Sequence, residues 1–344
     1  MKKLALLSLL IVTITGCSKL ADEEYKYATI NTSMENSSII SLYDSEGNYK
    51  GDKKIKYGGI TLAGFKKIGD DIKENIYYIS PVTNNKVNDF ILQINKNTLK
   101  PKTIVSSKGN NPTFFISDKK NIYSGSSGTN EVFLSKTNLE SNEVLKSTIL
   151  KDLGVGIVLV ERNERLYLIS FKETSSNYRL VLSVINKDNL NAEKTIDISD
   201  GSYVTSAKII NNYLYILKDR DGNDVLSNKI IRVNLDDYSS KVIELPFENL
   251  SQILADKNYL YITENDSFGE MTKHRIARLN INNLEINQYN TKNEHISSCI
   301  NKDEFISSDG KKIYIYNLSD FRLKKSFNLE EYKNKTFVSF FINN

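Results

Sequence analysis

The stretch Val184-Ile185-Asn186-Lys187-Asp188-Asn189-Leu190 is the clearest copy of a pattern that recurs along the chain. Each copy has an apolar residue at the end of a strand-like run, then Asn or Asp, then a short polar gap, and then Leu, Phe or Tyr. The seven copies are Tyr43-Asp44…Tyr49, Ile94-Asn95…Leu99, Thr137-Asn138-Leu139, Ile185-Asn186…Leu190, Val233-Asn234…Tyr238, Leu279-Asn280…Leu284 and Tyr316-Asn317…Phe321. Because Asn and Asp side chains hydrogen-bond the backbone that follows them, we expect each copy to start a turn between two strands.

A second repeated element precedes each turn, a short apolar strand centred on an aromatic residue. The aromatic residues recur every 44 to 48 residues, at Tyr77, Tyr123, Tyr167, Tyr215, Tyr261 and Phe305. Apolar residues flank them on both sides, which is typical of a strand buried on two faces. We interpret this repeat as core packing, in which the tyrosine ring fills volume and its hydroxyl reaches a polar rim.

Residues 200–247 show one complete repeat. We predict four strands there, at residues 203–210, 213–217, 229–234 and 240–245. A repeat near forty-five residues with four short strands favours a β-propeller or another β-repeat array.

The two ends of the sequence favour a closed ring. Phe340-Phe341-Ile342-Asn343-Asn344 matches Lys208-Ile209-Ile210-Asn211-Asn212, which closes a first strand, and Tyr25-Lys26-Tyr27 matches Tyr213-Leu214-Tyr215, which belongs to a second strand. One blade is therefore expected to be split between the chain ends, which leaves no unpaired edge. The predicted fold is all-β, a seven-bladed β-propeller of four-stranded antiparallel blades closed by this shared blade.

The N-terminal segment has the features of a bacterial lipoprotein signal. Lys2 and Lys3 precede an apolar run over residues 4–14, which is shorter than the roughly 20 residues that a spanning helix needs. Ile14-Thr15-Gly16-Cys17 follows and resembles a lipobox. We expect acylation of Cys17 to anchor the mature protein on the extracytoplasmic side of the cell membrane. An ordinary secretory signal with an incidental cysteine is the alternative.

The predicted organisation follows from these signals. We expect a signal peptide at residues 1–16, the lipidated cysteine and a tether at 17–24, and one propeller domain at 25–344. Its blades are expected at about residues 25–58 plus 335–344, 59–107, 108–150, 151–199, 200–247, 248–293 and 294–329.

The repeats resemble seven-bladed propellers of the YVTN and quinoprotein-like type, whose turns between the third and fourth strands carry Ile-Asp-x-x-Thr-x-x-Val. Residues 184–190 and 93–99 come closest, and the resemblance covers nearly all of residues 25–344. Quinoprotein propellers carry a docking tryptophan in each blade, whereas this chain has no Trp. The resemblance therefore implies the fold without a quinone, and we expect no cofactor.

Composition excludes several functional classes. Removal of Lys2 and Lys3 from the 46 basic residues leaves 44 against 42 acidic residues, unlike the basic footprint of a nucleic-acid binder. Two histidines, together with Cys299 as the one cysteine after Cys17, do not form a zinc-binding pattern. The chain also lacks G-x-S-x-G, H-E-x-x-H and P-loop signatures.

The longer loops connect second strands to third strands, and they all lie at one end of the propeller. We predict that this end is the working face, on which a ligand binds. These loops span residues 81–89, 124–130, 173–178, 218–228 and 264–273. On this face we expect Tyr203, Phe268 and His295 to be at least partly exposed and to bind a ligand.

The function favoured by the sequence is non-enzymatic. We expect a monomeric lipoprotein that binds a protein or glycan ligand. A hydrolase or lyase with acidic residues at the channel mouth, and an accessory subunit of a membrane complex, are the alternatives.

Replacement of the lipobox cysteine tests the anchor. We expect Cys17→Ser to abolish lipidation and firm membrane attachment, because no other cysteine occupies the lipobox. Detergent phase separation measures this, and a globomycin-type inhibitor should leave the wild-type precursor unprocessed. Wild-type protein found in the aqueous phase would contradict the prediction.

Overall fold

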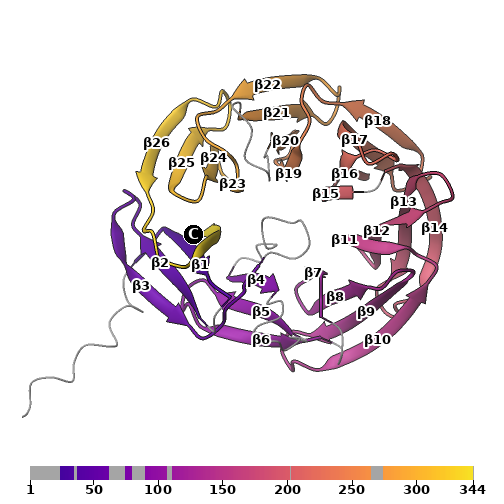
Figure 1. Ribbon diagram of the computed structural model, residues 1–344, viewed down its shortest axis with the longest axis horizontal. Helices are drawn as coiled ribbons and strands as arrows, with labels where there is room; N and C mark the ends of the chain where they lie inside the picture. Colours follow the sequence, from indigo (N-terminus) through magenta and orange to yellow (C-terminus); the bar gives the residue numbers. More distant parts are fainter. Residues whose placement is uncertain are drawn as a thin grey trace, which may run out of the picture.

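A computed structural model describes residues 24–34, 37–61, 74–79, 90–106, 111–201, 203–264 and 274–343. Within these ranges the strands form seven sheets that follow one another around a ring (Figure 1). The strands within each sheet pair antiparallel, and chain order runs from the centre of the ring outwards in all sheets but one, whose innermost strand is the last described strand of the chain. The protein is therefore an all-β seven-bladed propeller, as predicted.

The sheets are called blades 1 to 7 in chain order. Blade 1 contains β27 (Thr336–Ile342), β1 (Tyr27–Thr32), β2 (Ser38–Tyr43) and β3 (Tyr49–Ile55). The described part of blade 2 contains β4 (Asn75–Ile79), β5 (Phe90–Asn95) and β6 (Pro101–Val105), with Thr61 bridged to Ile79. Blade 3 contains β7 (Phe114–Ser117), β8 (Asn121–Ser127), β9 (Glu131–Asn138) and β10 (Val144–Lys151).

The remaining blades are continuous in sequence. Blade 4 contains β11 (Val155–Arg162), β12 (Arg165–Glu173), β13 (Tyr178–Asn186) and β14 (Ala192–Asp200). Blade 5 contains β15 (Tyr203–Ile210), β16 (Tyr213–Arg220), β17 (Leu226–Asn234) and β18 (Ser240–Glu244). Blade 6 contains β19 (Leu250–Ala255), β20 (Tyr259–Glu264), β21 (Arg275–Asn280) and β22 (Ile286–Asn290), and blade 7 contains β23 (Ser297–Asn301), β24 (Glu304–Ser308), β25 (Lys312–Asn317) and β26 (Leu323–Asn328).

The repeated Asn or Asp starts the turn between the third and fourth strands, which confirms its predicted role. Asn186 Oδ1 accepts the N–H of Asp188 at 2.9 Å, and the Leu190 N–H donates to the Asn186 carbonyl at 2.9 Å. The result is a five-residue turn whose last residue has a left-handed backbone. The residues in this conformation at the end of the equivalent turns are Leu99, Leu190, Tyr238, Leu284 and Phe321.

The left-handed conformation costs a residue with a side chain about 1–2 kcal/mol. Leu190 and Phe321 are buried, so removing their side chains from water offsets that cost. Two turns end differently from the prediction. Asn142 takes the left-handed position in blade 3 in place of Leu139, and Gly47 takes it in blade 1 in place of Tyr49. Both residue types adopt this conformation readily.

The repeated aromatic side chains lie in the core between blades, as predicted. Tyr77, Tyr123, Tyr167, Tyr215, Tyr261 and Phe305 are all buried. The hydroxyl of Tyr261 donates to Asp256 Oδ2 at 2.7 Å, and that of Tyr123 donates to Asp118 Oδ2 at 3.3 Å. Asp118 and Asp256 themselves start tight turns between first and second strands. Through these hydroxyls, the buried aromatic residues connect the core to the turns between first and second strands.

Blade 1 closes the ring with strands from both ends of the described chain, which confirms the split blade. β27 pairs antiparallel with β1, from Tyr27 opposite Ile342 to Thr32 opposite Thr336. Figure 1 shows β27 at the inner end of this blade, next to β1. The pairing makes the first and last described strands neighbours.

The connection from β26 to β27 also supports the closed ring, because its residues form hydrogen bonds with blade 1. The Glu330 N–H donates to the Tyr43 hydroxyl at 2.8 Å, and the Tyr332 hydroxyl donates to Asp52 Oδ1. Lys335 Nζ donates to the Ser37 carbonyl at 3.0 Å. The connection is therefore held at three points along blade 1.

Truncation after Leu329 tests the closure. It removes the buried side chains of Phe340, Phe341 and Ile342 and leaves the edge of β1 unpaired. We expect aggregation or a loss of at least about 5 kcal/mol of unfolding free energy, measured by urea unfolding. A chain that lacks only Asn344 is the control. If the truncated chain unfolds like the control, β27 does not hold the ring closed.

Candidate functional site

The loop face is the end of the ring at which second strands connect to third strands and fourth strands lead to the next blade. Two long hairpins stand on it, β12–β13 in blade 4 and β16–β17 in blade 5. β12, β13 and β17 have 9 residues each, whereas β24 and β4 have 5. We call the end of these hairpins the ridge, defined as residues 171–179 and 218–226 together with Asp200, Gly201 and Tyr203.

Backbone hydrogen bonds fix the two hairpins of the ridge to each other. The Tyr178 N–H donates to the Gly222 carbonyl at 3.1 Å, and the Gly201 N–H donates to the Tyr178 carbonyl at 3.0 Å. A Cβ at position 222 would lie 3.1 Å from the Asp200 Cβ and 3.2 Å from the Tyr178 carbonyl oxygen. Glycine therefore permits the close approach of the two hairpins.

A charged pair strengthens the same junction. Lys218 Nζ lies 2.9 Å from Asp200 Oδ1, with the lysine side chain 2% exposed and the aspartate 54% exposed. Ser199 Oγ and the Gly222 N–H also donate to Asp200. Partial burial acts to raise the pKa of Asp200, but the hydrogen bond and charge of Lys218 outweigh it, and the pKa falls to about 2. Asp200 thus supplies the charge that balances a buried lysine.

Three aromatic rings lie along the ridge. Phe171 contacts Tyr178 edge to face at 5.8 Å between ring centroids, and it contacts Tyr203 at 5.7 Å with the two rings tilted by 36°. Tyr203 is 40% exposed, which agrees with the expectation of partial exposure. The register places Tyr203 opposite Arg220, and Arg220 opposite Leu226. Val225 and Leu226 are exposed, so the ridge presents an aromatic and aliphatic surface beside a guanidinium.

The strand that carries Tyr203 is irregular where it meets the ridge. The register of β15 against β16 shifts between Tyr203 and Val204 and again between Val204 and Ser206. Such bulges change the direction of the side chains beyond them and recur next to functional sites.

His295 does not lie on the surface, so the expectation of partial exposure is wrong. It is fully buried, with Nδ1 2.7 Å from Ser307 Oγ and Nε2 2.8 Å from Thr291 Oγ1. The ring also packs edge to face on Phe305 at 5.6 Å. Hydroxyl partners for both nitrogens make it a core residue of blade 7. Phe268 and Cys17 lie outside the described residues.

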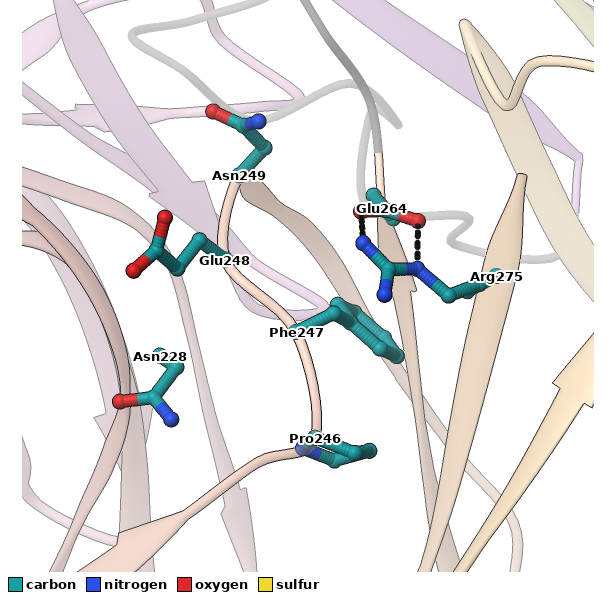
Figure 2. A pocket seen from close by; sticks show the side chains of 7 residues that line it. All are labelled: Asn228, Pro246, Phe247, Glu248, Asn249, Glu264 and Arg275. Atoms are coloured by element: carbon teal, nitrogen blue, oxygen red, sulfur yellow. Dashed lines mark hydrogen bonds and ion pairs between the residues drawn. The ribbon is translucent and has the colours of Figure 1, made fainter. Parts of the chain in front are cut away.

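A separate pocket lies on the loop face between blades 5 and 6 (Figure 2). Its cavity of about 350 Å³ is lined by Asn228, Pro246, Phe247, Glu248, Asn249, Glu264 and Arg275. Glu264 is buried and forms a two-pronged ion pair with Arg275, whose Nε donates to Oε2 at 2.6 Å and whose Nη2 donates to Oε1. This hydrogen bonding raises the pKa of Arg275. The guanidinium carbon lies 5.1 Å from the centre of the Phe247 ring.

Sequence reasoning missed Phe171, Tyr178 and the Glu264–Arg275 pair. Phe171 and Tyr178 flank the polar tip of one hairpin, and this pairing of aromatic residues across a loop is a signal that could have indicated them. Glu264 ends the apolar run of its strand, where a carboxylate needs a cationic partner. The identity of that partner is not visible from spacing.

No group of three or more His, Cys, Asp or Glu residues within the described ranges has a geometry that could hold a metal ion. The same ranges contain no helix of sufficient length and apolar character to cross a bilayer.

The chain matches no protein-family model, and it has no significant sequence match to a curated protein. Solved structures do match its fold. Apo AztD from Citrobacter koseri aligns at a TM-score of 0.52 and 10% identity, over 93% of this chain and 99% of that chain. A candidate 6-phosphogluconolactonase from Bacteroides fragilis aligns at a TM-score of 0.56 and 12% identity, over 94% and 99%.

A third structure, a functionally unknown protein from Desulfotomaculum acetoxidans, aligns at a TM-score of 0.58 and 11% identity, over 88% of this chain and 95% of that chain. Identities this low carry the fold alone, because propellers host many unrelated functions. The protein is therefore similar to these chains in fold, and its own fold is a seven-bladed β-propeller.

The acid dependence of stability tests the Lys218–Asp200 pair. The pKa of Asp200 is lower in the folded protein than its ordinary 3.8, so the pair stabilises fully above about pH 4 and less as the pH falls toward 2. In Lys218→Met, we expect the loss of unfolding free energy between about pH 4 and pH 2 to be smaller than in the wild type by about 1 kcal/mol. This value is reduced for solvent screening of the half-exposed carboxylate.

Urea unfolding at a series of pH values measures the difference between wild type and variant. Lys241→Met, at an exposed position of β18, is the matched control. A wild-type-minus-variant difference that stays constant between neutral pH and pH 2 would show that the pair does not set the pKa of Asp200.

Proposed function

We propose that this protein is a lipid-anchored binding protein of the cell envelope, and that it holds a protein partner on the ridge. The observation that carries the proposal is the exposed Tyr203 ring of β15, which packs against Phe171 beside two hairpins that backbone hydrogen bonds fix together. A rigid aromatic side chain contributes contact area without a large loss of conformational entropy on binding.

The composition of the ridge supports a protein partner. Tyr and Arg are enriched among the residues that dominate protein interfaces, and Tyr203 and Arg220 are neighbours across β15 and β16. Val225, 59% exposed, and Leu226 add apolar area at the same end of blade 5. Exposed apolar side chains that gather on a polar surface are typical of interaction sites.

The proposed location depends on the N-terminal sequence. Acylation of Cys17 would hold the propeller close to the outer surface of the membrane, with the short segment before Tyr25 as the tether. A partner in the envelope would then meet the ridge at high local concentration.

Replacement of the exposed side chains tests the ridge. We expect the double variant Tyr203→Ala with Leu226→Ala to bind its partner at least about tenfold more weakly, because each anchor contributes more than about 1 kcal/mol. The measurement is quantitative capture from cell-envelope extract, followed by titration of the captured partner. Thermal unfolding should change little, since both side chains are partly exposed.

The control variant carries Lys119→Ala, Lys120→Ala and Lys257→Ala on the opposite face. If the control loses the partner while the ridge variant retains it, the partner binds the opposite face and the proposal is wrong. If the ridge variant unfolds at a much lower temperature than wild type, Tyr203 and Leu226 have a structural role and the proposal fails.

A further inference from the structure

The pocket between blades 5 and 6 shares β17 with the ridge but is lined by none of the ridge residues. Its walls come from three parts of the chain, namely Asn228 in β17, the connection 246–249, and the Glu264–Arg275 pair in blade 6. Asn228 Nδ2 donates to the Leu245 carbonyl at 2.8 Å, and the Leu245 N–H donates to the Asn228 carbonyl at 2.7 Å. The wall from blade 5 is therefore fixed to the connection that forms the floor.

The ion pair fixes the opposite wall. Two guanidinium nitrogens of Arg275 are occupied by Glu264, and the planar group lies near Phe247. Nη1 is outside the pair, and in Figure 2 the nitrogen of Arg275 that carries no dashed line faces Phe247. Arg275 thus presents oriented N–H donors without a free charge, because Glu264 neutralises it.

The other lining groups provide mainly acceptors. The Glu248 carboxylate is exposed and lies across the pocket from Arg275 in Figure 2. The side-chain carbonyl of Asn228 adds a second acceptor, while its amide is bonded to Leu245. Pro246 adds a small apolar surface at the edge. Together with the amide of Asn249, these groups give the pocket both hydrogen-bond donors and acceptors.

This pattern excludes several kinds of ligand. An apolar molecule would leave the polar lining unpaired, which costs free energy for each group. An anion would meet Glu248 and an arginine whose charge is already balanced. A simple cation would leave the Arg275 N–H groups without acceptors. A neutral molecule whose groups both donate and accept hydrogen bonds meets none of these penalties.

We propose that this pocket binds a saccharide unit, with vicinal hydroxyls between Arg275 and Glu248 and a third hydroxyl at Asn228. A guanidinium and a carboxylate can each contact adjacent hydroxyls, the Asn228 side-chain carbonyl can accept from one more, and Pro246 would face the C–H side of the ring. The volume of about 350 Å³ lies within the range of small-molecule sites. The site is separate from the ridge and does not depend on the protein partner.

Saturation-transfer NMR on the full folded chain tests this, with methyl β-D-glucopyranoside and N-acetyl-D-glucosamine as probes at millimolar concentration. We expect saturation transfer to at least one sugar that does not change with ionic strength, because the ligand is neutral. Glu248→Ala and Asn228→Ala should each weaken binding about fivefold, the effect of losing one hydrogen bond. Glu244→Ala, exposed on β18, is the matched control.

Three results would overturn the proposal. The first is the absence of transfer to either sugar with the wild type. The second is transfer that both pocket variants retain at wild-type strength, which would place the sugar elsewhere. The third is binding of L-lysine or L-glutamate in preference to the sugars with a strong dependence on salt, which would make the pocket a site for a charged ligand.

Discussion

The pairing of β27 with β1 is the constraint on which the rest of this structure depends. Every blade packs its two faces against neighbours, so each contributes to a core that is continuous only if the ring is closed. The closing strand lies beside residues more than 300 positions earlier in the chain. Because such a contact orders a very long loop, its entropic cost is large. The buried Phe340, Phe341 and Ile342 and the hydrogen bonds of the preceding connection supply the compensating free energy.

Within a closed ring, the turns between third and fourth strands carry local strain that the core offsets. Leu190 has a φ of 57°, where glycine would be unstrained, yet its side chain is fully buried. The residue after the turn-starting Asn also reaches a neighbouring blade, since Lys187 Nζ lies 2.9 Å from Asp118 of blade 3. The same few residues therefore shape a turn and join two blades.

The loop face combines rigidity with variation. The ridge is held by backbone bonds at Gly222 and Gly201 and by the Lys218–Asp200 pair, so its exposed rings keep a fixed arrangement. The pocket is held by a buried ion pair, whose Glu264 would be costly to leave without its arginine. In both features an ion pair with one buried partner stabilises the backbone that carries the exposed side chains. The side chains above are then free to vary in chemistry without affecting the ring.

The sequence by itself determined the seven turns, the buried aromatic strands and the split blade, because each depends on residues close together or on a repeat that reads the same in every blade. It placed Tyr203 on an exposed face. It could not place His295, whose burial depends on Ser307 and Thr291. It also could not join Phe171 to Tyr203 or Glu264 to Arg275. The tertiary structure decided these contacts, because strand register and bulges set which side chains from separate strands and connections meet.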